Sequence, residues 1–207
     1  MTLRSLLNVD SVRKGYEVFS PVRPLRIAML SIHSNPLGEL GTEETGGMSV
    51  YIRELSRELG RAGHHVDIYT CAKSKKNGTG QFLSENVRLI HLDLGNIRLI
   101  SKKNLVENLQ EVFLALEAFI QSNPVFYDII HSHYWISALV GRLAQQRWYV
   151  PHVMMFHTTG IAKRIACGQE REPALRLITE KRLAHSCDRI VAPTLREKDL
   201  LSRDYSV

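Results

Sequence analysis

The stretches Leu25-Arg-Ile-Ala-Met-Leu-Ser-Ile32 and Gly46-Gly-Met-Ser-Val-Tyr51 decide the fold of this chain. The first is mostly apolar and has no helical period, which predicts a buried strand. A polar loop, residues 33–45, separates the two stretches. Apolar residues then recur at helical spacing, at Val50, Leu55 and Leu59. A strand that leads through glycines into a helix is the first unit of an α/β fold.

Two adjacent glycines, Gly46 and Gly47, stand where this helix is predicted to begin. Glycine lets backbone N–H groups approach a ligand closely, and the helix dipole favours an anion at that end. One interpretation is therefore a phosphate-bearing substrate. The other is a tight turn between strand and helix, because short glycine motifs are weak evidence. The pair alone leaves both open.

Strand and helix patterns continue to alternate along the chain. Further strands are predicted at 66–71, 87–92, 127–131, 152–156 and 188–192, and helices at 104–121, 136–148, 173–186 and 195–202. This alternation predicts an α/β fold with a Rossmann-like, doubly wound parallel sheet of about six strands. We expect residues 1–24 to form an N-terminal arm and residues 25–207 to form one domain.

Composition restricts the class of protein. The chain has 207 residues, of which 44% are hydrophobic and 23% charged, as in ordinary globular domains. Its three cysteines are widely spaced and form no disulfide framework, which favours a cytoplasmic location. The net charge is +6, and the basic residues that produce it are dispersed along the chain. The tightest cluster, Lys73, Lys75 and Lys76, is best interpreted as a solvated loop; binding of an anionic substrate or a membrane surface is the next interpretation. The sequence has no basic strand with interspersed aromatic residues, the pattern that would favour nucleic-acid binding.

Polar residues gather where three predicted strands end. His33-Ser-Asn35 follows the first strand, His131-Ser-His-Tyr-Trp135 the fourth and Phe156-His-Thr-Thr-Gly160 the fifth. In doubly wound sheets, ligands bind beyond the carboxyl ends of the strands. Histidines and hydroxyl groups at that edge suit hydrogen bonding to a polyol or a phosphate.

Each of these residues also has a purely structural interpretation. His131 is better explained as a buried strand-end histidine and Trp135 as packing, whereas His133, Tyr134 and His157 stand where binding is the better interpretation. His157 could instead cap the following turn. Two histidines could ligate zinc, but no Asp, Glu or Cys stands at a suitable spacing, so we predict no metal site. A nucleophile elbow and a P-loop are both absent.

Three ordered blocks resemble the N-terminal domain of a retaining, family 4 glycosyltransferase of the GT-B fold. They are His33-Ser-Asn-Pro-Leu37 with Gly41 and Thr45-Gly-Gly-Met-Ser-Val-Tyr51, then His131–Trp135, then Phe156–Thr158. The resemblance covers roughly residues 25–207 and is strongest to the branch that glycosylates inositol 3-phosphate, followed by the sucrose-phosphate synthases.

The resemblance implies transfer of a hexosyl group, with retention, from a UDP- or GDP-linked sugar to a polyol or sugar-phosphate acceptor, without a further cofactor. The N-terminal domain would bind the acceptor and a second domain the donor nucleotide. Gly46 and Gly47 would approach the donor diphosphate, and His157 would be the catalytic residue that orients the transferred sugar. Retention is described as front-face attack with the leaving diphosphate accepting the acceptor's proton, so no protein nucleophile is needed.

The inositol-phosphate branch binds the acceptor phosphate through a lysine, a tyrosine, a threonine and an arginine, which fall here on Lys102, Tyr134, Thr158 and Arg176. Cations and hydroxyl groups suit a phosphomonoester. We also expect acceptor contacts from His133 and Ser49. Lys103 could replace Lys102, and Arg176 could instead be a solvated helix charge. Ser49 stands where the relatives carry Asn, which leaves the acceptor's identity open.

The chain stops at Val207, after the helix that normally precedes the second domain. We therefore expect the donor-binding domain, with its E-x7-E element, to be absent and the chain alone to be inactive. The alternatives are a non-catalytic sugar-phosphate-binding or interaction module and a nicotinamide oxidoreductase, which lacks its G-x-G-x-x-G motif here. A lipid acceptor at a membrane is less favoured, because the helix predicted at 104–121 is acidic rather than basic.

Overall fold

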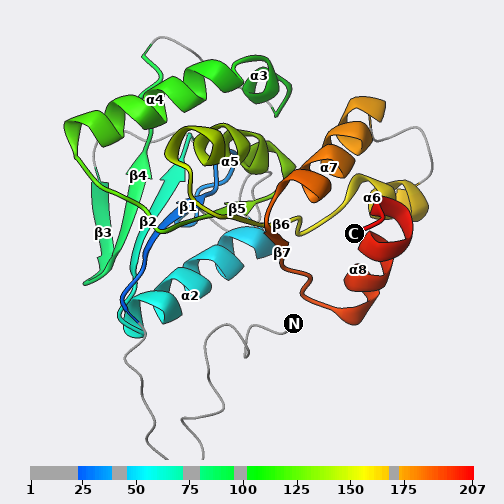
Figure 1. Ribbon diagram of the computed structural model, residues 1–207, viewed down its shortest axis with the longest axis horizontal. Coiled ribbons are helices and arrows are strands. Elements are labelled where there is room, and N and C mark those ends of the chain that lie inside the picture. Colours follow the sequence, from blue (N-terminus) through cyan, green and yellow to red (C-terminus); the bar gives the residue numbers. More distant parts are fainter. Residues whose placement is uncertain (1–22, 39–45, 72–79, 96–101, 168–172) are drawn as a thin grey trace, which may run out of the picture.

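A computed structural model describes residues 23–38, 46–71, 80–95, 102–167 and 173–207 (Figure 1). Almost all of the predicted N-terminal arm, the lysine cluster at 73–76 and the loop residues Gly41 and Thr45 lie outside these residues.

The centre of the molecule is a seven-stranded sheet with the order β3-β4-β2-β1-β5-β6-β7. The strands are β1 Arg26–Leu30, β2 His65–Thr70, β3 Gly80–Ser84, β4 Val87–His91, β5 Ile129–His133, β6 His152–Met155 and β7 Arg189–Ile190. All neighbours are parallel except β3, which pairs antiparallel with β4. The predicted doubly wound α/β sheet is thus confirmed.

Two details of the predicted strands are wrong. The prediction of about six strands omits β3, an edge strand that is largely exposed and therefore lacks the apolar alternation of a buried strand. The strand predicted at 127–131 runs from Ile129 to His133, so that His133 lies within β5. The polar residues His131 and His133 masked the true end of this strand.

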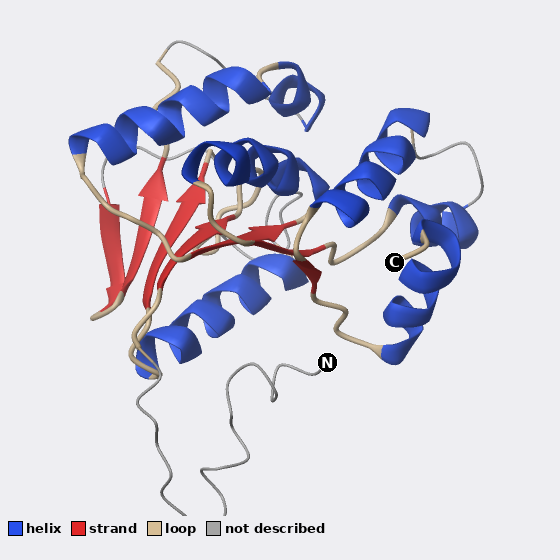
Figure 2. Cartoon of the chain, in the orientation of Figure 1, coloured by secondary structure: helices blue, strands red, loops and turns tan. Residues whose placement is uncertain are grey.

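Helices cover both faces of the sheet. They are α2 Gly47–Arg61, α3 Lys102–Glu107, α4 Leu109–Ser122, α5 Trp135–Trp148, α6 Gly160–Cys167, α7 Ala174–Ser186 and α8 Leu195–Leu200, which continues into a π-helix, Leu201–Tyr205. Figure 2 shows α2 on one side of the sheet and α4 and α5 on the other. None of the described helices has the length and apolar character needed to cross a membrane.

Two helix predictions need correction. The single helix predicted at 104–121 is divided at Asn108, whose backbone leaves the helical region and whose side-chain amide donates to the Asn104 carbonyl at 2.8 Å. Asparagine competes with helical hydrogen bonding in this way. The short helix α6 was not predicted, because eight residues carry too few turns for a recognisable period.

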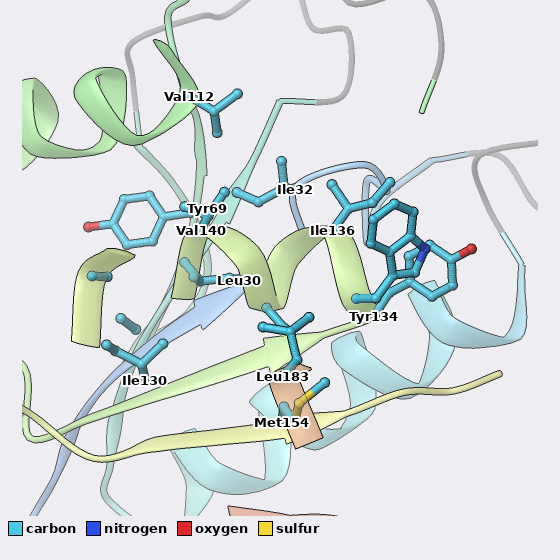
Figure 3. Close-up of a cluster of buried hydrophobic side chains, with 14 of the residues drawn as sticks. Leu30, Ile32, Tyr69, Val112, Ile130, Tyr134, Ile136, Val140, Met154 and Leu183 are labelled. Carbon is cyan, nitrogen blue, oxygen red and sulfur yellow. The ribbon is translucent and has the colours of Figure 1, made fainter. Parts of the chain in front are cut away.

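The core follows the alternation of side chains along the strands. One set of strand residues packs beneath α2, including Ile27, Met29, Val66, Ile68 and Leu89. The alternate set packs against the helices of the opposite face; it includes Leu30, Tyr69 and Ile130 beside Val112 and Val140 (Figure 3). Burial on both faces explains why the central strands are nearly continuous apolar runs.

The chain order creates one reversal point in the sheet. From β1 it proceeds outward through β2 to β4, and it then returns to β5 on the other side of β1. Ligands of open α/β sheets bind in the crevice beyond the carboxyl ends of the strands at such a reversal. A ligand is therefore expected beyond the carboxyl ends of β1, β5 and β6.

Candidate functional site

Imidazole rings from the ends of two strands, β5 and β6, meet at this edge. His133, the last residue of β5, approaches His157, which follows β6, with 2.8 Å between Nδ1 and Nε2. The His131 ring lies 4.2 Å from that of His133, measured between centroids. Tyr51, from the second turn of α2, packs edge-on against His157 at 5.3 Å. The structure thus brings together the histidines that the sequence placed at separate strand ends.

Burial keeps these imidazoles neutral. Desolvation lowers the pKa of His131 to about 3 and that of His157 to about 4. It also lowers the pKa of His33 to about 3, with a further contribution from the positive charges of Lys102 and Arg176. The pKa of His133 is held well below 6.5, mainly by burial. At neutral pH these four histidines can therefore donate and accept hydrogen bonds without carrying a positive charge.

Several of these buried polar atoms have no hydrogen-bond partner among the described residues. They are His33 Nδ1, His131 Nε2, His133 Nε2 and Trp135 Nε1. Buried polar groups are normally satisfied, since leaving one unpaired costs about 1–3 kcal/mol. Unsatisfied atoms gathered at a sheet edge are what a site for a polar ligand requires.

Cationic side chains surround the Tyr134 ring. Lys102 Nζ lies 5.4 Å and Arg176 Cζ 5.0 Å from the ring centroid, and the His33 ring lies 4.6 Å from it. Lys103, in contrast, points to solvent and lies 3.7 Å from Glu107. Of the two lysines that the sequence left open, it is thus Lys102 that faces the predicted phosphate-binding tyrosine.

Two predicted site residues have unusual backbone conformations. Tyr134 has φ of +74° and His157 has φ of +61°, in the region that favours glycine. Such conformations cost about 1–3 kcal/mol and cluster at functional sites, where surrounding structure enforces them. The Tyr134 N–H donates to the Met155 carbonyl at 2.8 Å, which ties the end of β5 to the end of β6.

Arg176 is buried, with only 3% of its surface exposed. Its Nε donates to Glu180 Oε1 at 2.6 Å, and its terminal nitrogen donates to the Thr158 carbonyl at 2.7 Å. The alternative that Arg176 is a solvated helix charge is therefore wrong. Thr158 itself is exposed, on the turn between His157 and α6.

Ser49 occupies a different environment from the other predicted acceptor residues. It is fully buried in the first turn of α2, and its Oγ lies 2.6 Å from Ser34 Oγ. Ser34 also presents its carbonyl to the hydroxyls of Ser31 and Thr70. In this structure the Ser49 hydroxyl therefore fastens α2 to the loop after β1.

The glycine pair is exposed at the start of the fifteen-residue helix α2. Gly46 has φ of −140°, and neither glycine has a positive φ. A Cβ atom built on Gly46 or Gly47 would meet no described atom within 4 Å. Among the described residues, neither a positive φ nor close packing requires glycine at these two positions, and close approach of a ligand to the first N–H groups of α2 stays a prediction beside the tight-turn interpretation.

Sequence reasoning missed two residues of the site. Glu180, which pairs with Arg176, is fully buried, and Tyr205 donates to its Oε2 at 2.5 Å. The spacing of Arg176 and Glu180, four residues apart on a helix, is a recognisable ion-pair signal. Tyr205 gives no local signal, because its partner is distant in sequence. No group of three or more possible metal ligands is arranged for an ion within the described ranges.

The family model that matches this chain is described as Glycosyltransferase Family 4, and it covers residues 45–207. The chain belongs to this family. The predicted resemblance is thereby confirmed.

Two relatives of this chain are named as glycosyltransferases that act on inositol 3-phosphate. D-inositol 3-phosphate glycosyltransferase of Streptomyces griseus is 39% identical over 186 residues, which are 88% of this chain and 39% of the relative. D-inositol 3-phosphate glycosyltransferase 2 of Catenulispora acidiphila is 40% identical over 187 residues, 88% of this chain and 43% of that protein. The chain thus spans about two fifths of the length of these relatives.

Solved structures agree with the fold. Sucrose-phosphate synthase from Thermosynechococcus elongatus has a TM-score of 0.78 and 29% identity, over 86% of this chain and 45% of that one. The catalytic domain of starch synthase IV from Arabidopsis thaliana, at 13% identity, shares the fold alone, with a TM-score of 0.55 over 88% of this chain and 50% of that one. The predicted half of a GT-B fold is confirmed by these neighbours.

Proposed function

We propose that this chain is the acceptor-binding half of a retaining hexosyltransferase, which transfers a sugar from a UDP- or GDP-linked donor to a phosphorylated polyol or sugar. A second, donor-binding domain would be its partner. The observation that carries the proposal is the cationic cluster of Lys102 and Arg176 around Tyr134, next to the neutral His157. The names of the relatives, which include D-inositol 3-phosphate glycosyltransferase and sucrose-phosphate synthase, support the same class of acceptor.

The cluster has the chemistry that a phosphomonoester needs. Lys102 supplies a point charge and Arg176 a planar guanidinium, and hydrogen bonds from such cations to phosphate are about twice as strong as neutral ones. The hydroxyl groups of Tyr134 and Thr158 would complete the contacts. His133, buried against His157, would reach the acceptor only through its neighbour or at its unsatisfied Nε2.

The rest of the edge suits the donor. A neutral His157 would orient the transferred sugar by hydrogen bonding, and its contact with His133 fixes the ring. The first N–H groups of α2 at Gly46 and Gly47 would approach the donor diphosphate. In front-face attack that diphosphate takes the acceptor's proton, so this chain's residues bind, orient and exclude water. Nucleotide sugars and polyol phosphates are soluble, which fits a cytoplasmic protein.

Isothermal titration of the 207-residue chain tests the acceptor site. We expect D-inositol 3-phosphate to bind, and myo-inositol to bind at least ~10-fold more weakly, because a charge-assisted hydrogen bond contributes about 1.5–3 kcal/mol. Lys102→Ala should remove most of this difference. Its matched control is Lys103→Ala, which removes an exposed charge one residue away. Equal binding of both ligands, or equal damage by both substitutions, would contradict the proposal.

A separate experiment tests whether sugar transfer requires a second, donor-binding domain. The chain is incubated with radiolabelled UDP- and GDP-sugars and inositol 3-phosphate, and the product is separated by anion exchange. We expect no transfer by the chain alone. Transfer by a preparation of verified mass would show that no second domain is needed. Intact mass of the natural polypeptide then decides between an enzyme with a second α/β domain and a non-catalytic sugar-phosphate-binding module.

A further inference from the structure

Glu180 is a fully buried carboxylate that joins three separate segments. Its Oε1 accepts from Arg176 Nε at 2.6 Å, one turn earlier on α7. Its Oε2 accepts from the Gly160 N–H, at the start of α6, at 2.8 Å. The same oxygen accepts from the Tyr205 hydroxyl, in the π-helix, at 2.5 Å. A charge this deeply buried is stable only when it is paired and hydrogen-bonded, as it is here.

The contact with Glu180 fixes one side of the Arg176 guanidinium. The Thr158 carbonyl fixes another, by accepting from a terminal nitrogen at 2.7 Å. The guanidinium carbon is thereby held 5.0 Å from the centroid of the Tyr134 ring. Two contacts in different directions determine the plane of the group, which leaves it little rotational freedom.

The same carboxylate fixes the turn that carries the other site residues. A Cβ atom built on Gly160 would lie 3.3 Å from Glu180 Oε2 and 3.4 Å from Arg176 Nε. The backbone at Gly160 therefore packs directly against the ion pair. His157 and Thr158 stand immediately before this point, and the positive φ of His157 requires a surrounding structure that enforces it.

We infer that Glu180 is the positioning residue of the acceptor-phosphate site. Its carboxylate holds Arg176 and the turn at 157–160 in one arrangement, so that the guanidinium and the Thr158 hydroxyl face the same phosphate. The inference rests on the function proposed above. Without the carboxylate, Arg176 loses the hydrogen bond from its Nε and the Gly160 N–H loses its acceptor, so the guanidinium and the turn are no longer held in one arrangement.

If Glu180 acted only through its charge, Glu180→Gln would change the phosphate affinity in the opposite direction. A negative charge beside Arg176 repels a phosphate, so its removal by Glu180→Gln would tighten binding if position did not matter. If Glu180 positions the arginine, the same isosteric substitution weakens binding. The direction of the change therefore separates the two roles.

The matched control is Asp67→Asn, in β2, which lies on the other side of β1 from β5 and β6. Asp67 is also a buried carboxylate that accepts from an arginine and a tyrosine: Arg88 at 2.6 Å through both oxygens, and Tyr127 at 2.7 Å. Asp67→Asn thus removes an equivalent charge and disturbs an equivalent network without touching the site. The comparison of the two variants therefore distinguishes displacement of Arg176 from a general loss of folding stability.

The experiment is titration of the wild-type chain and both variants with D-inositol 3-phosphate and with myo-inositol. We expect Glu180→Gln to raise the Kd for the phosphate at least ~10-fold and that for myo-inositol less than ~2-fold, with Asp67→Asn close to wild type for both. If the wild-type chain does not distinguish the ligands, the proposed function fails and the positioning role falls with it. If it does, and Glu180→Gln is unchanged, tighter or no worse than Asp67→Asn, the positioning inference alone fails.

A spectroscopic measurement does not depend on the variant's folding. In the wild-type chain with 15N-labelled arginine, the hydrogen-bonded Nε–H of Arg176 should exchange slowly with solvent, as should that of Arg88. Arg176→Lys identifies the first signal. Glu180→Gln should abolish that signal and leave the Arg88 signal in place. Absence of a protected Arg176 Nε–H in the wild-type chain would overturn the inference, whether or not Glu180→Gln folds.

Discussion

The buried histidines make the stability of this domain dependent on pH. Burial is the main cause that lowers the pKa of His33, His131, His133, His152 and His157 below 6.5, and it also lowers the pKa of the less buried His64. A group whose pKa is lower in the folded state stabilises that state above its unfolded pKa. The contribution is lost as pH falls from about 6.5 toward the folded values near 3–4.

The size of the effect follows from the unfolded chain. At pH 5.5 about nine tenths of unfolded histidines are protonated, and keeping one neutral in the folded state costs about 1.4 kcal/mol. His133 and His152 are fully buried and together remove about 3 kcal/mol between pH 7.5 and pH 5.5. All five together remove about 7 kcal/mol, against a typical total stability of about 5–15 kcal/mol.

Urea unfolding followed by tryptophan fluorescence, at pH 7.5, 6.5 and 5.5, measures this loss. The free energy of unfolding should fall by about 3–7 kcal/mol over that range, with an uptake of about two to five protons on unfolding. His152→Asn should lower the number of protons taken up on unfolding by about one, which is measured as a smaller dependence of the free energy of unfolding on pH. His185→Gln is the control, because an exposed side chain meets water in both states. Equal stability at pH 7.5 and pH 5.5, to within about 0.5 kcal/mol, would refute the reasoning.

Three further substitutions test single contacts by the same urea unfolding at pH 7.5. Gly141→Ala places a methyl group 2.6 Å from His152 Nε2 and should cost about 1–3 kcal/mol; no loss would mean that the helix shifts freely. Gly47→Ala meets no described atom, so stability should stay the same or rise by up to about 1 kcal/mol, and a clear loss would point to a structural role. Tyr127→Phe leaves Asp67 without one donor and should cost about 1–3 kcal/mol, with inositol 3-phosphate affinity unchanged.

Most of the fold could be predicted from the sequence because the strands of a doubly wound sheet are buried on both faces. Such strands stand out as apolar runs between amphipathic helices, and β1 and β2 were placed to within two residues. The edge strand β3 could not be predicted in this way, since it is largely exposed and held by its pairing with β4. Its position depends on hydrogen bonds to a neighbour and not on its own pattern.

The site was predictable where topology alone determines proximity. His33, His133 and His157 stand at or just beyond the carboxyl ends of neighbouring strands, so the rule for carboxyl ends was sufficient to group them. Burial was not predictable, because it depends on tertiary packing. Arg176 could have been a solvated charge on its own helix, and only its contact with Thr158, eighteen residues earlier, decides otherwise. The Ser34–Ser49 contact likewise joins residues fifteen positions apart.

The charges at this edge bear on the proposed reaction. Lys102 and Arg176 stand around the Tyr134 ring, and the first turn of α2 is joined to the loop after β1 by the contact between Ser49 and Ser34. The imidazoles of His33, His133 and His157 at the same edge are kept neutral by burial. Such a site offers positive charge to a phosphate and neutral hydrogen-bonding groups to an uncharged sugar. Neutral histidines matter here, because a cation in their place would compete with Lys102 and Arg176 for the phosphate.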